Sequence, residues 1–283
     1  GLCVLRFLPI VRSSLNFGLT YSLAHCPVFG VHRRCHKREF LLKYAKDRHR
    51  WLQWLFEAKK RYGLVILNYA VTSNHIHLLA YDSSDQDVIP KSMQLVAGRT
   101  GQEYNIRKRR KGAFWEDRYH ATIIEGGEHL LRCIVYIDMN MVRARVVEHP
   151  AQWVHGGYKE IQAPRRKCIL IDYERLQKLC GFDQYESFQT AHRRWVETAV
   201  SEEIPQREPT WTQAVAVGSE SFVDKIKKQL KALAIGRRIV PTTDGWELRE
   251  ETSSYNPFLE GQKVDIALEN TYPWEESGAL SLP

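Results

Sequence analysis

Two short apolar runs that are neighbours in the chain restrict most strongly what it can fold into. Residues 64–71 and residues 75–81 are rich in β-branched and aromatic side chains, and only Thr72-Ser73-Asn74 separates them. Short runs of this composition on both sides of a small polar linker are typical of a β-hairpin. The sequence therefore predicts two adjacent antiparallel strands, and the fold must contain a sheet that accommodates them.

Further segments with helical or strand-like periodicity surround this hairpin. Helices are expected over residues 37–62, from residue 90 to the basic stretch 107–111, and over residues 128–145. Strands are expected within residues 21–32 and over residues 114–124. The order strand, helix, strand, strand, helix, strand, helix predicts an α+β fold, a ferredoxin-like antiparallel sheet sandwich with one extra helix.

The chain is expected to divide into four parts, because its composition changes after Pro150. The α+β domain is assigned to residues 26–160, and residues 1–25 before it have no clear assignment. Residues 161–240 are expected to form a mostly helical accessory region. The acidic tail, residues 241–283, is rich in Glu, Pro, Gly and Ser, which predicts irregular structure.

The charge and the cysteines narrow the classes of function. Lys and Arg number 41 against 33 Asp and Glu, and this surplus favours a polyanionic partner. Six scattered cysteines without a C-x-x-C pair are expected to be free thiols in a reducing compartment, which argues against a cysteine zinc site. No apolar run reaches the length of about 18 residues that a membrane span needs, so we expect a soluble protein. The phosphate-binding motif G-x-x-x-x-G-K-[ST] does not occur in the sequence, which argues against an NTPase.

Two pairs of polar residues are candidates for chemistry. His75 and His77 are two residues apart on a predicted strand, so both imidazoles project from the same face and can share a divalent metal. A pair of histidines packed under a helix is the alternative for such a pattern. Tyr136 and Asn140 are four residues apart on a predicted helix and share one helical face, which is also common on helices without a catalytic role.

Three blocks of sequence occur together in an order that carries a resemblance. The blocks read Tyr-Ala-Val-Thr-Ser-Asn-His-Ile-His-Leu-Leu at 69–79, Gly-Ala-Phe-Trp-Glu-Asp-Arg-Tyr at 112–119 and Tyr-Ile-Asp-Met-Asn-Met-Val-Arg-Ala at 136–144. Over about residues 35–158 the chain resembles the single-tyrosine transposases among the HUH single-strand DNA endonucleases. It is most similar to the REP-associated tyrosine transposases. Two positions depart from that family, which commonly has Pro where Met141 stands and Gly where Arg145 stands.

The resemblance implies both a fold and a function. It implies an HUH-type sheet in which His75, His77 and Asn140 hold Mg²⁺ or Mn²⁺ and Tyr136 is the nucleophile, with Tyr119 as a second candidate. The activity it implies is metal-dependent cleavage and rejoining of single-stranded, hairpin-containing DNA through a 5′-phosphotyrosine intermediate. It further implies a bacterial, cytoplasmic protein associated with the nucleoid, and we favour a monomer over a dimer.

Cationic and aromatic residues near these blocks are the expected contacts to DNA phosphates and bases. They are Arg107, Lys108, Arg109, Arg110, Lys111, Arg118, Tyr119 and Arg143. Two other functions stay open from the sequence. One is a non-catalytic regulator that binds DNA hairpins, and the other is a nickase similar to replication initiators.

Overall fold

A sheet of seven strands organises the described part of the chain, which a computed structural model gives for residues 28–82, 87–202 and 208–250. The strand order is β2-β3-β1-β4-β5-β7-β6. The first four strands pair antiparallel, in the order of a ferredoxin-like sheet, so the predicted α+β fold is confirmed. The strands are β1 (Val28–Arg34), β2 (Val65–Val71), β3 (His75–Tyr81), β4 (His120–Ile124), β5 (Ala216–Gly218), β6 (Arg237–Thr242) and β7 (Gly245–Glu250).

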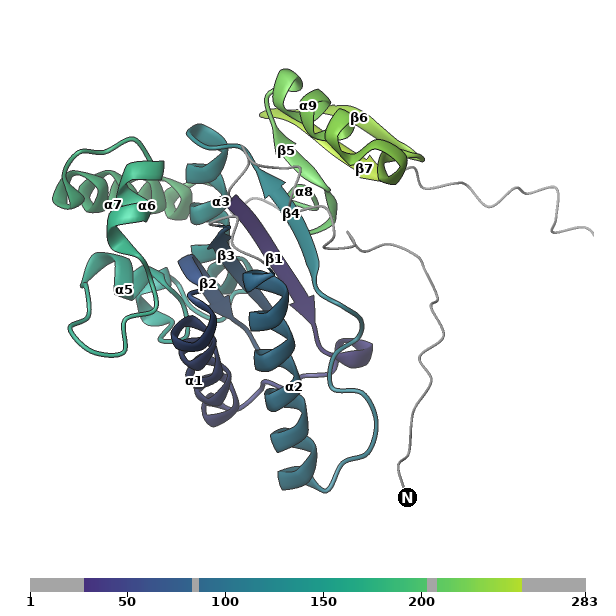
Figure 1. Ribbon diagram of the computed structural model, residues 1–283. Coiled ribbons are helices and arrows are strands. Elements are labelled where there is room, and N and C mark those ends of the chain that lie inside the picture. The colour runs from purple at the N-terminus through teal and green to yellow at the C-terminus, as the bar shows by residue number, and fades with distance from the viewer. Residues whose placement is uncertain (1–27, 83–86, 203–207, 251–283) are drawn as a thin grey trace, which may run out of the picture. The chain divides into compact units, whose positions relative to one another are not determined.

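Helices cover both faces of this sheet (Figure 1). The longer helices α1 and α2 lie side by side across one face, while α3 lies on the other. Asn68 of β2 marks the α3 face, because its side-chain amide donates to the Ile134 carbonyl of α3 at 3.3 Å. The helices are α1 (Ala45–Tyr62), α2 (Val88–Lys108), α3 (Glu128–Asp138), α4 (Asn140–Arg143), α5 (Tyr158–Gln162), α6 (Tyr173–Leu179), α7 (Tyr185–Ser201), α8 (Thr210–Gln213) and α9 (Glu220–Leu230).

The predicted hairpin is confirmed, but the segment that precedes α1 is not helical as expected. Residues 39–44 form an irregular turn after the short 3-10 helix His36–Arg38, and α1 begins only at Ala45. Long-range hydrogen bonds explain the difference, because the Leu42 amide donates to the Ser73 carbonyl at 2.9 Å. The backbone of this segment is therefore tied to the β2–β3 turn. At its other end α1 stops at Gly63, whose φ of 71° is left-handed, the conformation that glycine adopts without strain.

The helix expected over residues 128–145 is interrupted. Met139 separates α3 from α4, with a ψ of −2° that departs from regular helix. After α4, Arg145 takes a left-handed φ of 54°. Glycine is favoured in that conformation, which accounts physically for the Gly of the resembling family at this position.

Residues 161–240 contain helices α6, α7, α8 and α9, and strands enter only near the end of the described chain. Strands β5, β6 and β7 extend the sheet beyond β4, and β5 pairs with β4 in parallel. Residues 241–250, expected in an irregular tail, belong to the β6–β7 hairpin. A signal was present in the sequence, since Asp244-Gly245 between apolar Val240 and Trp246 is typical of a hairpin turn. The rest of the expected tail, residues 251–283, and the expected N-terminal segment lie outside the described residues.

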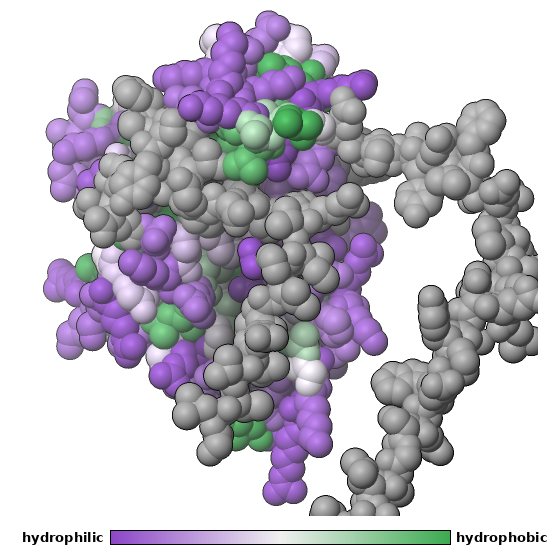
Figure 2. Space-filling model, turned by 45° about the vertical axis from the view of Figure 1, so that its right-hand side comes forward, coloured by the Kyte–Doolittle hydropathy of each residue, from purple (hydrophilic) through white to green (hydrophobic). Residues whose placement is uncertain are grey.

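The core lies between the sheet and the helices on its two faces. Trp51 of α1, Met93 of α2 and Leu78 of β3 are fully or almost fully buried, as is Phe188 of α7. Polar side chains prevail over the described surface that Figure 2 shows, with apolar side chains in small groups. No helix among the described residues is both long and apolar enough to cross a membrane.

A buried acid–histidine pair fixes α3 to the rest of the molecule. Asp138, the last residue of α3, accepts a hydrogen bond from His192 of α7 through Oδ2, at 2.8 Å, and one from Asn68 of β2 through Oδ1, at 3.1 Å. The other ring nitrogen of His192 lies 2.8 Å from the Gln162 amide nitrogen, a donor, so the ring carries its proton on Nε2. The Asp138 and His192 side chains are 1% and 0% exposed. Each of the two buried side chains thus needs the other as its hydrogen-bond partner.

We expect substitution of either partner to destabilise the fold strongly. Asp138→Ala or His192→Ala leaves a polar group buried without its partner, which costs about 3 kcal/mol in free energy of unfolding. The double variant is expected to cost clearly less than the sum of the two. Denaturant unfolding of the four proteins measures this coupling energy.

The exposed ion pair between Glu174 and Lys178 provides the matched control. Its N–O distance is 2.5 Å, but both side chains are mostly exposed. Solvent screens such a pair, so its double-mutant cycle is expected to give a coupling near zero. Equal coupling in the two cycles contradicts the anchoring role of Asp138.

Candidate active site

Three histidines from neighbouring strands form a cluster on the sheet face that α3 covers. His75 and His77 lie on β3, and His32 of β1 is directly opposite His77 in the antiparallel register. Paired residues project from the same side of a sheet, so the three imidazoles converge. Each offers a ring nitrogen, and these nitrogens all lie within 4.8 Å of one another. The His32 ring centroid is 4.9 Å from that of His77 and 5.6 Å from that of His75.

Sequence reasoning missed His32, although the residue closes the cluster. It falls at the end of the expected strand 21–32, and the sequence alone does not give the register of that strand against β3. A fourth histidine, His120 of β4, is opposite His32 on the other side. Its Nε2 lies 2.9 Å from the Ala214 carbonyl, so this ring is engaged with the C-terminal segment, and burial lowers its pKa.

Asn140 bridges the two β3 histidines from the opposite side. Its Oδ1 lies 3.2 Å from His75 Nε2, and its Nδ2 lies 2.8 Å from His77 Nε2. The ring of His75 is held from behind, because its Nδ1 lies 2.7 Å from Asn74 Oδ1 and 3.0 Å from Thr72 Oγ1. Both Nε2 atoms therefore point away from the hairpin turn, toward the start of α4. The structure brings together these sequence-predicted residues.

Tyr136 lies beside the cluster. Its ring meets the His77 ring edge-on, with centroids 5.7 Å apart, and the Trp211 ring of α8 lies 6.2 Å away. The Arg143 guanidinium sits 4.0 Å above the centre of the Tyr136 ring and donates to the Tyr136 carbonyl at 2.7 Å. Burial lowers the pKa of Arg143, which Tyr136 and Glu208 partly counteract. A cation in this position stabilises the phenolate form of tyrosine.

The second candidate tyrosine occupies a different environment. Tyr119 precedes β4 and lines a cavity of about 970 Å³ whose wall also includes His32. Burial raises the pKa of the Tyr119 phenol, and the nearby Arg33 only partly counteracts this. The Tyr136 ring, by comparison, contacts the β3 histidine His77.

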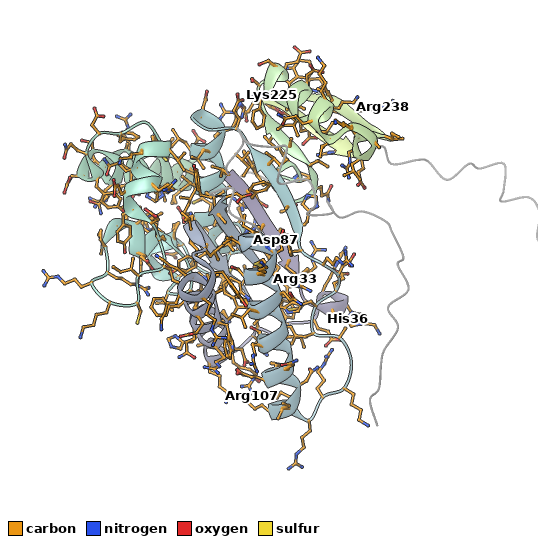
Figure 3. The ribbon with its side chains drawn as sticks, viewed as in Figure 1. Arg33, His36, Asp87, Arg107, Lys225 and Arg238 are labelled. Carbon is orange, nitrogen blue, oxygen red and sulfur yellow. The ribbon has the colours of Figure 1, made fainter. Side chains whose placement is uncertain are left out.

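The cationic residues expected to bind DNA do not form one surface. Arg107, labelled in Figure 3, lies at the end of α2 and forms an ion pair with the buried Asp47. Arg110 donates to the Ala113 carbonyl at 2.9 Å. Arg143 contacts Tyr136 as described above. Lys108, Arg109, Lys111 and Arg118 are exposed, and Arg118 lines the cavity beside Tyr119.

The donor set of the cluster fits a divalent metal ion. Three imidazole nitrogens and the amide oxygen of Asn140 converge from β1, β3 and α4. Imidazole ligands suit transition metals, and the carboxamide oxygen adds a harder ligand that Mg²⁺ and Mn²⁺ accept. The hydrogen bonds to His75 Nδ1 orient one of these rings, as outer partners commonly do at metal sites.

The chain is similar to known proteins at low sequence identity. No curated protein sequence matches it. A solved structure of a REP-associated tyrosine transposase bound to a REP hairpin has 14% identity and a TM-score of 0.42, covering 49% of this chain and 81% of that one. A Deinococcus radiodurans R1 protein described as a transposase has 15% identity and a TM-score of 0.31, covering 42% of this chain and 89% of that one.

A family model also matches part of the chain. The model described as "Transposase IS200 like" matches residues 31–140. This segment contains His32, His75, His77, Tyr136 and Asn140. The resemblance found in the sequence is thus confirmed, because residues 31–140 match the model of this family.

Proposed function

We propose that the chain is a metal-dependent single-strand DNA endonuclease and transposase, which cleaves and rejoins hairpin-containing DNA. The observation that carries the proposal is the convergence of His75, His77 and Asn140 with Tyr136 in one chain. These residues come from strand β3 and from helices α3 and α4, about 60 residues later, in a segment that matches a transposase family. Because one copy holds all of them, the geometry also supports a monomer as the active form.

The metal would be held by His75, His77 and Asn140, with His32 as a further ligand. When bound, a divalent ion acts as a Lewis acid on the scissile phosphate. Imidazole-rich sites favour Mn²⁺ over Mg²⁺, which prefers oxygen ligands, so we expect higher activity with Mn²⁺. The chain's own contribution includes the His75 ring, whose orientation is already fixed by Asn74 and Thr72.

Tyr136 would form the covalent bond to DNA. Its phenolic oxygen attacks the phosphorus and loses its proton, a P–O bond to tyrosine forms, and the bond from phosphorus to the 3′-oxygen breaks. The products are a 5′-phosphotyrosine and a free 3′-hydroxyl, and the 3′-hydroxyl of another strand reverses the step to rejoin DNA. The Arg143 guanidinium supports the attack, because it stabilises the negative charge of the deprotonated phenol.

The DNA would extend from this site over exposed cations. Arg118 and Tyr119 line the adjoining cavity, and Lys108, Arg109 and Lys111 are exposed near the end of α2. Such cations track the phosphate backbone without reading sequence. The substrate class, a hairpin-forming DNA repeat, follows from the resemblance in the sequence.

A covalent adduct tests the nucleophile directly. Labelled hairpin-bearing single strands incubated with the purified protein and Mn²⁺ are expected to give a band in a denaturing gel that protease treatment removes. Tyr136→Phe lacks the nucleophilic oxygen and is expected to abolish this band. The matched control, Tyr119→Phe, is expected to retain it.

Three other outcomes count against parts of this proposal. Loss of the adduct in Tyr119→Phe alone assigns the nucleophile to Tyr119. An equal or lower rate with Mn²⁺ than with Mg²⁺ contradicts the expected metal preference. Hairpin binding without any adduct favours a non-catalytic regulator.

The role of His32 has a readout that needs no DNA. His32→Ala removes one imidazole from the cluster and is expected to weaken Mn²⁺ binding about tenfold or more, measured by calorimetry. His120→Ala is the matched control, since His120 lies on the same face but contacts Ala214. Unchanged Mn²⁺ affinity in His32→Ala, with lower affinity in His77→Ala, excludes His32 from the ligand set.

A further inference from the structure

The cavity beside the histidine cluster arises from a mismatch in the sheet. Strands β1 and β4 pair at His32 and His120, and the chain before β4 meets β1 again where Cys35 pairs with Trp115. Between these points β1 advances by three residues and the other segment by five. The extra residues bulge away from β1 and leave the cavity of about 970 Å³.

Side chains from both sheet faces and from the C-terminal hairpin line this cavity. His32 and Arg33 are consecutive on β1, so they project to opposite faces, and both reach the wall. The β6–β7 hairpin contributes Arg237 and Glu250. The cavity therefore joins the histidine cluster to a part of the chain outside the matched residues 31–140.

Two arginines in this wall have buried N–H groups that the described residues leave without an acceptor. These are Nε of Arg33 and Nη1 of Arg237. The Arg237 side chain is 10% exposed, and its Nη2 donates to Glu250 at 3.1 Å. Burial lowers the pKa of Arg33 to about 10, so the residue is still a cation at neutral pH, and its guanidinium lies 5.2 Å from the centre of the Trp115 ring.

The charge balance of the wall favours an anion at these two donors. Arg33, Arg34, Arg118 and Arg237 face the carboxylates of Glu116, Asp117 and Glu250. Glu116 lies 4.0 Å from Arg34, and Glu250 is engaged with Arg237 through a different nitrogen. A buried charged donor without an acceptor is costly, and phosphate oxygens match the guanidinium group in geometry and charge.

We propose that this cavity is a subsite for a phosphate of the single DNA strand, bound by Arg33 and Arg237. The inference rests on the proposed function, because it describes the path of the cleaved DNA strand beside His32. It extends that function by assigning a DNA contact to the β6–β7 hairpin. Trp115 and Tyr119 add aromatic faces in the same wall, which suit a neighbouring base.

Binding without metal tests this subsite separately from cleavage. The full chain with Tyr136→Phe, in EDTA, is titrated against a fluorescent single-stranded oligothymidylate, and anisotropy is followed over a range of salt concentrations. Arg33→Gln and Arg237→Gln are each expected to weaken binding about tenfold and to reduce the salt slope by about one. The matched control is Arg238→Gln, an exposed neighbour on β6 that projects to the other side and is expected to bind as the parent does.

A chemically modified DNA strand distinguishes the loss of a specific phosphate contact from misfolding of a variant. A single uncharged methylphosphonate is moved along the oligothymidylate, and one position is expected to weaken binding of the parent about tenfold. In Arg237→Gln the same position is expected to cause no further loss, because the lost contact is the same. Losses that add fully, or Arg33→Gln and Arg237→Gln affinities equal to that of Arg238→Gln, overturn the subsite.

The outcomes separate this inference from the proposed function. Normal adduct formation by the otherwise unchanged chain, with unaltered binding by Arg33→Gln and Arg237→Gln, removes the subsite alone. Weaker binding by both variants, together with no adduct in the unchanged chain, supports the subsite and contradicts the proposed endonuclease activity. Displacement of the oligothymidylate by millimolar inorganic phosphate at constant ionic strength assigns the cavity to free phosphate and contradicts a strand subsite.

Discussion

The position of α3 over the sheet depends on one carboxylate. Asp138 ends the helix and is held on two sides, by Asn68 of β2 and by His192 of α7. Tyr136 and Asn140 are each two residues from Asp138 in the sequence. The position of Asp138 therefore sets where these two side chains lie relative to the β3 histidines. A buried, fully paired acid of this kind contributes less to net stability than to defining one arrangement. In this molecule, that arrangement is the placement of α3 relative to the imidazoles of His75 and His77.

The C-terminal part of the described chain frames the candidate site on two sides. Trp211 of α8 packs beside Tyr136, and Arg237 of β6 reaches the cavity that His32 also lines. Both residues lie beyond the segment that matches the transposase family. Two proteins with the same chemistry in that segment can therefore differ in the surroundings of the tyrosine and in the path of the strand.

The sequence predicted the features that depend on local pattern and failed where distant segments decide the outcome. The hairpin and the common face of His75 and His77 follow from composition and from strand alternation, and both are present. His32 was missed because its place depends on register between strands that are far apart in the chain. The turn around Leu42 was expected to be helical, and its hydrogen bond to Ser73 is a tertiary contact that periodicity does not encode. In the same way β5, with three residues, is too short to give a periodic signal.

The parallel pairing of β4 with β5 has a consequence for the design of a shorter chain that keeps only the family-matched segment. In the four-stranded portion β4 would be an outer strand, with its backbone amides and carbonyls open to any other strand. A chain cut after the family-matched segment would expose that edge and would be prone to self-association. A workable minimal version has to retain β5 or to blunt β4 with a charged or proline substitution, so the boundary of the smallest useful fragment is set by the sheet and not by sequence similarity.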